Sequence, residues 1–415
     1  MEKQRGLGYA AAFVGAIVLV EPYIHPAWVI SNTPAWLAFM HPEWLTALFI
    51  ICGALLLLRF FNTKYLTYTF CILAVLYGVG LLPFFVLATT LAMLVLGEMV
   101  FQSREEDLNT YLYYVISTAL AGVLVMAYLN EKAILTLIFG IIAAVLLKVI
   151  LLKYEDSLVI EGIGIAMTMY LIEELNYKAD FQIIVFAVLV SFAFGYFAFR
   201  AKTADLSGLF SIALVGIILL VFADARWLLV MLVFFIMGSA GTRYKFEYKK
   251  RIGVEQGHSG ARGYRNVFAN GIISCVAAIL YGIYAEPVFI VMYVGGVATA
   301  AADTLASEIG VTGGIPTMIT TFKKVPIGTN GGVTWTGELV ALLGGFTISL
   351  VALALGLITP SMLVICTIAA FVGTNIDSFI GATLENREFF GNAGTNLAAT
   401  MGGCIFAMAL YLIFH

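Results

Sequence analysis

Long apolar stretches dominate the sequence, and short polar segments separate them. A helix needs roughly 20 mostly apolar residues to cross the hydrocarbon core of a bilayer, and about fifteen segments meet this pattern. They are residues 7–22, 45–60, 66–81, 83–101, 111–129, 132–152, 158–174, 182–199, 206–223, 226–242, 267–284, 286–302, 338–357, 360–381 and 395–414. Residues 66–101 fit one long helix as well as two short ones, which leaves the number open by one or two.

The composition supports a membrane location. Of the 415 residues, 62% are hydrophobic and 11% are charged, whereas soluble domains have about a quarter charged residues. The mean hydropathy is +1.00. The net charge of -3 gives no overall positive field that would attract nucleic acid. We therefore predict an all-α, polytopic integral membrane protein whose surroundings are the lipid bilayer, and we exclude a soluble enzyme, a disordered chain and a nucleic-acid binder.

The basic residues predict the orientation. With the N-terminus in the cytoplasm, alternating spans leave only Lys132, Lys178 and Arg226 of the 22 lysines and arginines on the outer side. Cytoplasmic loops of membrane proteins carry an excess of lysine and arginine, so a cytoplasmic N-terminus is predicted.

The chain divides into two parts of different character. Residues 1–180 consist almost entirely of spans and short connections, and we treat them as an N-terminal transmembrane domain of unknown role. Glu98 and Glu161 lie in this part, and placement at helix ends is the simplest explanation for both. Residues 181–415 contain a polar interval at 243–266 with seven basic residues, and several of their spans carry carboxylates. We expect the functional site in this second domain.

The segment 295–310 carries a polar stripe in an apolar helix. Thr299, Asp303 and Ser307 recur every four residues and so share one helix face, with Glu308 beside them. The intervening alanines also suit a packing face with a capping acid, which is the alternative interpretation. Because a carboxylate inside a span is costly, function is the favoured explanation.

A second segment, 322–334, combines lysines with a loop rich in glycine. Lys323 and Lys324 precede the loop residues Gly328, Thr329, Asn330, Gly331 and Gly332. Successive N–H groups in such a loop bind anions, and lysine supplies positive charge for phosphate. The order differs from a Walker A loop, where the lysine follows the glycines. A plain turn between two spans is the alternative.

A third segment, 373–385, places Asp377, Gly381 and Glu385 on one helix face. The predicted topology brings this helix end and that of Asp303 to the same membrane surface. Mg²⁺ binds one or two carboxylates together with phosphate oxygens, and it neutralises a phosphoryl group during transfer. We therefore predict Asp303 and Asp377 as Mg²⁺ ligands, with Glu308 as a further ligand or a support for them.

Other polar residues are candidates for substrate binding. Arg265 can hold a phosphate, while Asn270 lies one turn beyond Asn266 where the helix enters the membrane. A membrane anchor that attracts anionic lipid is the alternative explanation for the basic residues, but it does not explain the two asparagines. Asn396, before the last span, suits either a helix cap or the same site.

Four motifs carry a resemblance to a known family. The segments Arg265-Asn-Val-Phe-Ala-Asn-Gly271, Ala302-Asp-Thr-Leu-Ala-Ser-Glu-Ile-Gly310, Gly328-Thr-Asn-Gly-Gly-Val-Thr334 and Asp377-Ser-Phe-Ile-Gly-Ala-Thr-Leu384 resemble the transmembrane protein 19 family over about residues 182–415. Plant phytyl-phosphate kinases belong to this family, and for them the resemblance implies phosphorylation of an isoprenoid monophosphate to the diphosphate by a nucleoside triphosphate. The family is distantly similar to CTP-dependent polyprenol kinases and CDP-diacylglycerol synthases.

Together these features lead to one hypothesis. We expect a Mg²⁺-dependent membrane phosphotransferase that acts at the cytoplasmic face, takes a phosphoryl group from a nucleoside triphosphate such as CTP, and phosphorylates an isoprenoid monophosphate or alcohol. Lys323, Lys324 and the 328–332 backbone would bind the nucleotide phosphates and Arg265 the acceptor, with Asn270, Ser307 and Asn396 completing the substrate site. The lack of a well-placed histidine favours a phosphate acceptor, which needs no strong general base.

Two alternatives stay open at this point. The same site suits a cytidylyltransferase that makes a CDP-lipid, and carboxylates inside the membrane suit a cation-coupled secondary transporter. The patterns specify neither the lipid, the nucleotide nor the oligomeric state. Whether Asp303 and Asp377 are neighbours in space decides whether the predicted metal site exists.

Overall fold

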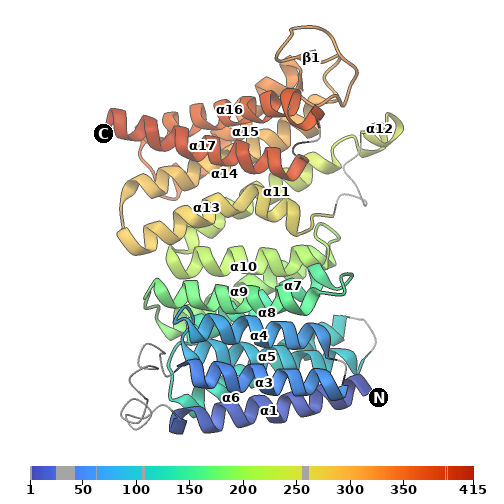
Figure 1. Cartoon of the computed structure of the whole chain (residues 1–415). Coiled ribbons are helices and arrows are strands. Elements are labelled where there is room, and N and C mark those ends of the chain that lie inside the picture. Colours follow the sequence, from blue (N-terminus) through green and yellow to red (C-terminus); the bar gives the residue numbers. More distant parts are fainter. Residues whose placement is uncertain are drawn as a thin grey trace. The chain divides into compact units, whose positions relative to one another are not determined.

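The chain is mainly helical. The computed structural model describes residues 2–24, 43–61, 63–104, 108–254, 261–387, 389 and 391–415. In these residues it forms sixteen α helices, a short 3₁₀ helix and one pair of antiparallel strands (Figure 1). Its contacts divide it into two compact units, Met1–Lys178 and Ala179–His415, each described here by itself.

The first unit contains seven helices in the described residues: α1 (Glu2–Ile24), α3 (Glu43–Phe61), α4 (Lys64–Gly78), α5 (Phe84–Gln102), α6 (Leu108–Leu129), α7 (Ile134–Leu151) and α8 (Ser157–Glu174). Residues 66–101 form two helices, because Gly80 has a φ of +75° and Pro83 is the N-cap of α5. Lys148 of α7 lies 2.5 Å from a Glu98 oxygen of α5 and 3.5 Å from a Glu161 oxygen of α8. The two glutamates are therefore part of a buried ionic cluster, which the sequence interpretation missed.

The second unit contains the remaining helices: α9 (Phe181–Arg200), α10 (Leu206–Phe222), α11 (Ala225–Arg243), α12 (Phe246–Arg251), α13 (Tyr264–Tyr284), α14 (Pro287–Gly310), α15 (Trp335–Ala354), α16 (Pro360–Thr383) and α17 (Asn392–Phe414). The strands β1 (Thr317–Met318) and β2 (Gly332–Val333) pair between α14 and α15, and the 3₁₀ helix η3 (Glu385–Arg387) follows α16.

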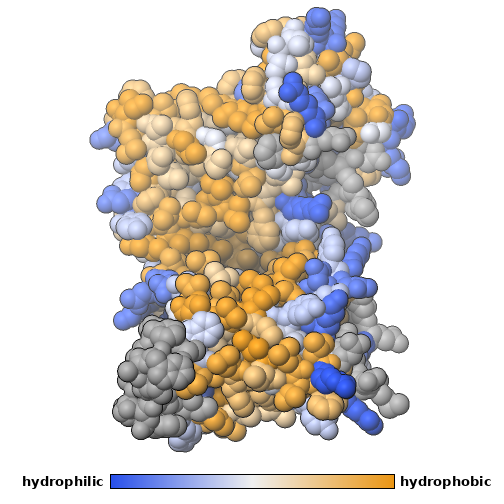
Figure 2. All heavy atoms as spheres, in the orientation of Figure 1, coloured by the Kyte–Doolittle hydropathy of each residue, from blue (hydrophilic) through white to orange (hydrophobic). Residues whose placement is uncertain are grey.

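Each of the fifteen predicted segments coincides with a helix, and α12 is additional. Eleven helices of the described residues are long and apolar enough to cross a membrane, and α10 is a shorter apolar helix. On the helices of the second unit, hydrophobic residues cover the sides, while hydrophilic ones gather at helix ends and over the segment with β1 (Figure 2). The predicted class, a polytopic α-helical membrane protein, is confirmed, while the number of spans and the orientation stay predictions.

Helix α14 is the centre of the second unit. It packs against α11, α13, α15, α16 and α17, and most of its residues are buried. The neighbouring helices approach α14 closely because they present small residues to it. A Cβ added to Gly403 of α17 would lie 2.0 Å from Thr299 Oγ1, and one added to Gly373 of α16 would lie 2.4 Å from Thr299 Cγ2. Small residues allow such close contact between membrane helices. Helix α14 also continues beyond its predicted end at residue 302, so that Asp303 and Ser307 lie within it.

This packing predicts unequal effects of two glycine substitutions. Gly373→Ala places a methyl group against Thr299, and we expect a loss of about 1–3 kcal/mol in stability from overpacking. Gly271→Ala in α13 is the control, because its Cβ would have only ordinary contacts at 3.9 Å and beyond. Thermal unfolding of both purified variants in detergent measures the difference. Equal unfolding temperatures would contradict the proposed packing.

Candidate functional site

A pocket of about 180 Å³ lies where α14 and α16 end and where α15 and α17 begin. Four carboxylates line it: Asp303 of α14, Glu338 of α15, Asp377 of α16 and Glu385 of η3. Asp303 and Asp377 are 74 positions apart in the sequence and yet line the same cavity. The structure thus brings together the two residues on which the predicted metal site depends.

The acidic charge of this pocket is not balanced by its own lining. In the part of the chain that the structure describes, no lysine, arginine or histidine lines it. Asn375 Nδ2 donates to Glu338 Oε2 at 3.2 Å, but the buried Oδ1 of Asp377 has no hydrogen-bond partner among the described residues. A buried carboxylate oxygen without a partner is costly. The pocket is therefore suited to a bound cation.

The glycine-rich loop forms part of the wall of the pocket. All five predicted loop residues, 328–332, line the pocket. Gly328 and Gly331 have φ values of +87° and +77°, which residues with a side chain rarely adopt. A Cβ on Gly331 would also lie 2.4 Å from Ala382 Cβ, so glycine is required for the loop to pack against the end of α16.

Hydrogen bonds hold this loop and leave some of its donors unused. Gly332 N–H donates to Thr329 O at 3.0 Å, and Ile319 N–H donates to Gly331 O at the same distance. Within the described ranges, the N–H groups of Gly328, Asn330 and Gly331 have no backbone acceptor. These donors are available to an anion such as a phosphate group.

Thr334 joins the helices that border the pocket. Its Oγ1 caps α15 by accepting from Gly337 N–H at 3.0 Å, and it donates to Gly310 O at the end of α14 at 3.1 Å. The two helices approach closely at this point, since a Cβ added to Gly310 would lie 3.1 Å from Gly337 Cα. This junction places Glu338 on the first turn of α15, beside the loop.

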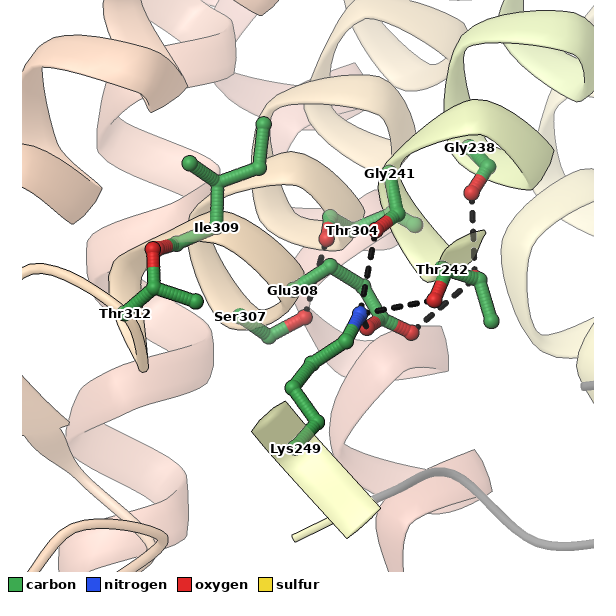
Figure 3. A network of polar contacts seen from close by, with 9 residues as sticks. All are labelled: Gly238, Gly241, Thr242, Lys249, Thr304, Ser307, Glu308, Ile309 and Thr312. Atoms are coloured by element: carbon green, nitrogen blue, oxygen red, sulfur yellow. Dashed lines mark hydrogen bonds and ion pairs between the residues drawn. The ribbon is translucent and has the colours of Figure 1, made fainter. Parts of the chain in front are cut away.

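Glu308 belongs to a different set of contacts (Figure 3). Its Oε2 lies 2.5 Å from Lys249 Nζ of α12, and its Oε1 accepts from Thr242 Oγ1 of α11 at 3.0 Å. Lys249 Nζ also donates to the backbone oxygens of Gly241 and Thr242. Both charged side chains are buried. Glu308 does not line the acidic pocket, because five residues along a helix turn it by roughly 140° from Asp303.

The other predicted residues divide into two groups. Ser307 lines the pocket together with the loop residues. Lys323 and Lys324 are exposed on the segment before the loop and lie outside the lining. Arg265 is exposed, with its Nε donating to Tyr264 Oη at 3.1 Å. Asn270 and Asn396 are buried in α13 and α17, also outside the lining, where Asn270 Nδ2 donates to Asn266 O.

Two lining residues escaped the sequence interpretation. Glu338 lies one helical turn after the loop ends at Thr334. This short distance in the sequence from the glycine-rich loop was the signal that could have identified it as a pocket residue. Asn392 lies in the same short segment as Asn396, and the structure places Asn392 rather than Asn396 at the pocket. Glu385 shares a helix face with Asp377 in the sequence and lines the pocket beside it.

The comparisons with known proteins place this region in a family. The family described as integral membrane protein DUF92 matches residues 189–412, which include the whole pocket. The chain belongs to this family. The assignment agrees with the resemblance to the transmembrane protein 19 family that the motifs carry.

Three relatives illustrate the range of the family. An uncharacterised membrane protein of Methanocaldococcus jannaschii is 33% identical over 51% of this chain and 87% of its own length. "Protein VTE6, chloroplastic" of Arabidopsis thaliana is 35% identical over 41% of this chain and 52% of its own length. "Protein PGR" of the same plant is 34% identical over 50% of this chain and 80% of its own length. No solved structure matches the chain.

The buried ion pair predicts a marked loss of stability when it is broken on one side. Lys249→Met leaves the Glu308 charge buried and unpaired, which we expect to cost about 3–5 kcal/mol. Lys250→Met, on the exposed side of the same helix, is the control. In the double variant Lys249→Met with Glu308→Leu, much of the stability should return. Thermal unfolding in detergent measures all three, and a Lys249→Met protein as stable as Lys250→Met would refute the role of the pair.

Proposed function

We propose that the protein is a Mg²⁺-dependent membrane phosphotransferase that transfers a phosphoryl group from a nucleoside triphosphate, with CTP as the expected donor, to an isoprenoid monophosphate. The observation that carries the proposal is the joint presence of four carboxylates and a glycine-rich loop around one pocket without a basic residue in its described lining. Such a lining is repulsive to a polyphosphate on its own, and it becomes attractive once a divalent cation is bound.

The residues of the pocket fit Mg²⁺. This ion prefers oxygen ligands and usually takes one or two carboxylates, water and substrate phosphates. Among the described residues, no group of three or more His, Cys, Asp or Glu is placed to hold a metal ion, so the two aspartates would need water and phosphate oxygens to complete the coordination. Asp303 and Asp377 would hold the ion, and the unpartnered Asp377 Oδ1 is a ready ligand. When bound, Mg²⁺ would neutralise charge on the transferring phosphoryl group.

The loop and the helix ends would bind the nucleotide phosphates. The unused N–H groups of Gly328, Asn330 and Gly331 are the proposed donors. Helices α15 and α17 begin at the pocket, and the positive ends of their dipoles favour anions. Lys323, Lys324 and Arg265 lie outside the lining, so we assign them no contact with the phosphates inside it.

The acceptor chemistry follows from the groups available. An oxygen of the acceptor monophosphate would attack the γ-phosphorus, forming a new P–O bond while the bond from that phosphorus to the β–γ bridging oxygen breaks and the nucleoside diphosphate leaves. This oxygen carries no proton that must be removed, so a described lining that contains no histidine is consistent with the reaction. The choice of an isoprenoid chain rests on the resemblance of the motifs to the transmembrane protein 19 family, to which plant phytyl-phosphate kinases belong.

The place of the pocket argues against transport. Sites of secondary transporters lie near the middle of the membrane, on interrupted helices. Here the carboxylates gather at helix ends. The cytidylyltransferase alternative uses the same pocket and differs in its product.

Labelled nucleotides distinguish these reactions. Purified protein with Mg²⁺ and geranylgeranyl or phytyl monophosphate is supplied with CTP labelled at the γ-phosphate or, separately, at the α-phosphate. We expect label in the lipid only from the γ-phosphate, and chelation of the metal should abolish the transfer. Label retained from the α-phosphate would identify a cytidylyltransferase instead. Absence of transfer with every nucleoside triphosphate would refute the proposal.

Substitution of the two aspartates tests the site itself. Asp303→Asn and Asp377→Asn should each lower the rate by roughly 100-fold or more, because a metal ligand contributes several kcal/mol to stabilising the transition state. Glu286→Gln is the matched control, since Glu286 is exposed at the opposite end of α14. Size-exclusion profiles and unfolding temperatures check that the variants are folded. Full activity in Asp303→Asn would exclude the pocket as the active site.

A further inference from the structure

A second pocket in the unit Ala179–His415 lies among α9, α10, α11 and α13 and has a volume of about 290 Å³. It shares no residue with the acidic pocket. Its described lining is almost entirely apolar, with side chains such as Phe194, Leu228 and Phe235, and it contains one charged residue, Arg262. A charged residue in such surroundings requires an explanation.

The backbone of Arg262 is held by hydrogen bonds through both its N–H and its carbonyl group. Its N–H donates to Thr203 O at 2.9 Å, and its carbonyl oxygen accepts from Asp205 N–H at 3.2 Å. Its guanidinium lies over the rings of Phe234 and Phe235 and so close to Gly238 that a Cβ there would be 2.2 Å from Nη2. The segment thus holds the guanidinium inside the helix bundle, where the residue is only 8% exposed.

The charge of Arg262 is not compensated within the described residues. No hydrogen bond or ion pair of its guanidinium is found there, and the acid that acts on it electrostatically is Glu308. Glu308 is already paired with Lys249. Burial lowers the pKa of Arg262 to about 10, so the group is still charged at neutral pH. These three buried residues carry a net charge of one positive unit, which is costly without an anion.

The surroundings indicate what kind of anion fits. Asn266 on the first turn of α13 lines the same pocket, and the positive end of this helix adds to the attraction. The rest of the lining suits a hydrocarbon chain. Phe197 and Ile236 line the pocket while being 66% and 64% exposed, so the pocket reaches the outer surface of the unit, from which a lipid can enter.

We propose that this pocket binds a lipid phosphate monoester, with its phosphate against Arg262 and Asn266 and one hydrocarbon chain between α9, α10, α11 and α13. The inference rests on the uncompensated charge and the apolar lining. It does not depend on the proposed phosphotransfer.

The test measures lipid binding apart from catalysis. Geranylgeranyl monophosphate is titrated calorimetrically, with chelator and without nucleotide, into protein carrying Asp303→Asn and Asp377→Asn, so that the acidic pocket contributes neither metal nor turnover. Adding Arg262→Met should weaken binding roughly tenfold or more, because charge-assisted hydrogen bonds are lost. Arg200→Met, which removes an exposed charge at the end of α9 outside the pocket lining, is the matched control and should bind as before.

Further measurements in the same experiment distinguish the contribution of the hydrocarbon chain of the lipid from that of its phosphate. Val267→Phe keeps Arg262 but fills the pocket and should also weaken binding, which keeps the proposal testable if Arg262→Met does not fold. Inorganic phosphate and geranylgeraniol should each bind roughly tenfold more weakly than the monoester, since each lacks one half of the interaction. Equal binding by Arg262→Met and Arg200→Met, or binding of geranylgeraniol as tight as that of the monoester, would overturn the proposal. Loss of phosphotransfer in the aspartate variants would leave this result unaffected.

Discussion

The cost of placing charge in an apolar bundle governs the architecture of this protein. An ionised group away from water needs an opposite charge or a set of hydrogen bonds. Lys249 and Glu308 satisfy this requirement by direct pairing, and backbone oxygens at the end of α11 take up the remaining lysine donors. In the unit Met1–Lys178, Lys148 pairs with Glu98 at 2.5 Å and lies 3.5 Å from a Glu161 oxygen, while neither oxygen of Glu161 accepts a hydrogen bond among the described residues. Where the chain itself supplies no such partner, a bound ion, a ligand or water has to supply one, or the group changes its protonation state.

The second unit can hold its charged groups in place because its helices pack closely. Glycines and alanines around α14 bring α16 and α17 against Thr299, one turn before Asp303. At the end of α14, Thr334 ties α15 to the same point. The acidic side chains therefore project from helix ends that are fixed relative to one another, which is what a preorganised site requires.

Sequence patterns were sufficient for the helices, because a span of apolar residues is a strong and local signal. They also singled out Asp303, Asp377 and the 328–332 loop, which line one pocket in the structure, since carboxylates within spans and clustered glycines are conspicuous. They did not separate Glu308 from Asp303, because the sequence shows directly how far apart two residues are along a helix but less clearly which face of the helix each one occupies. The engagement of Glu308 depends on Lys249, which is contributed by α12, a six-residue helix without an apolar pattern of its own. Glu338 was missed for a similar reason: its place in the pocket lining depends on the junction between the end of α14 and the start of α15.

The small volume of the acidic pocket has a consequence for how specificity is divided. Ligand sites usually measure about 300–1,000 Å³, whereas this one measures about 180 Å³. It has space for phosphate groups but not for a whole nucleotide together with a lipid. In the proposed reaction, the base of the donor nucleotide and the tail of the lipid acceptor would therefore be recognised by surfaces outside this pocket. Under that proposal, members of the family could share this pocket and use different substrates, because the surfaces that select the substrates would be separate from the residues that react.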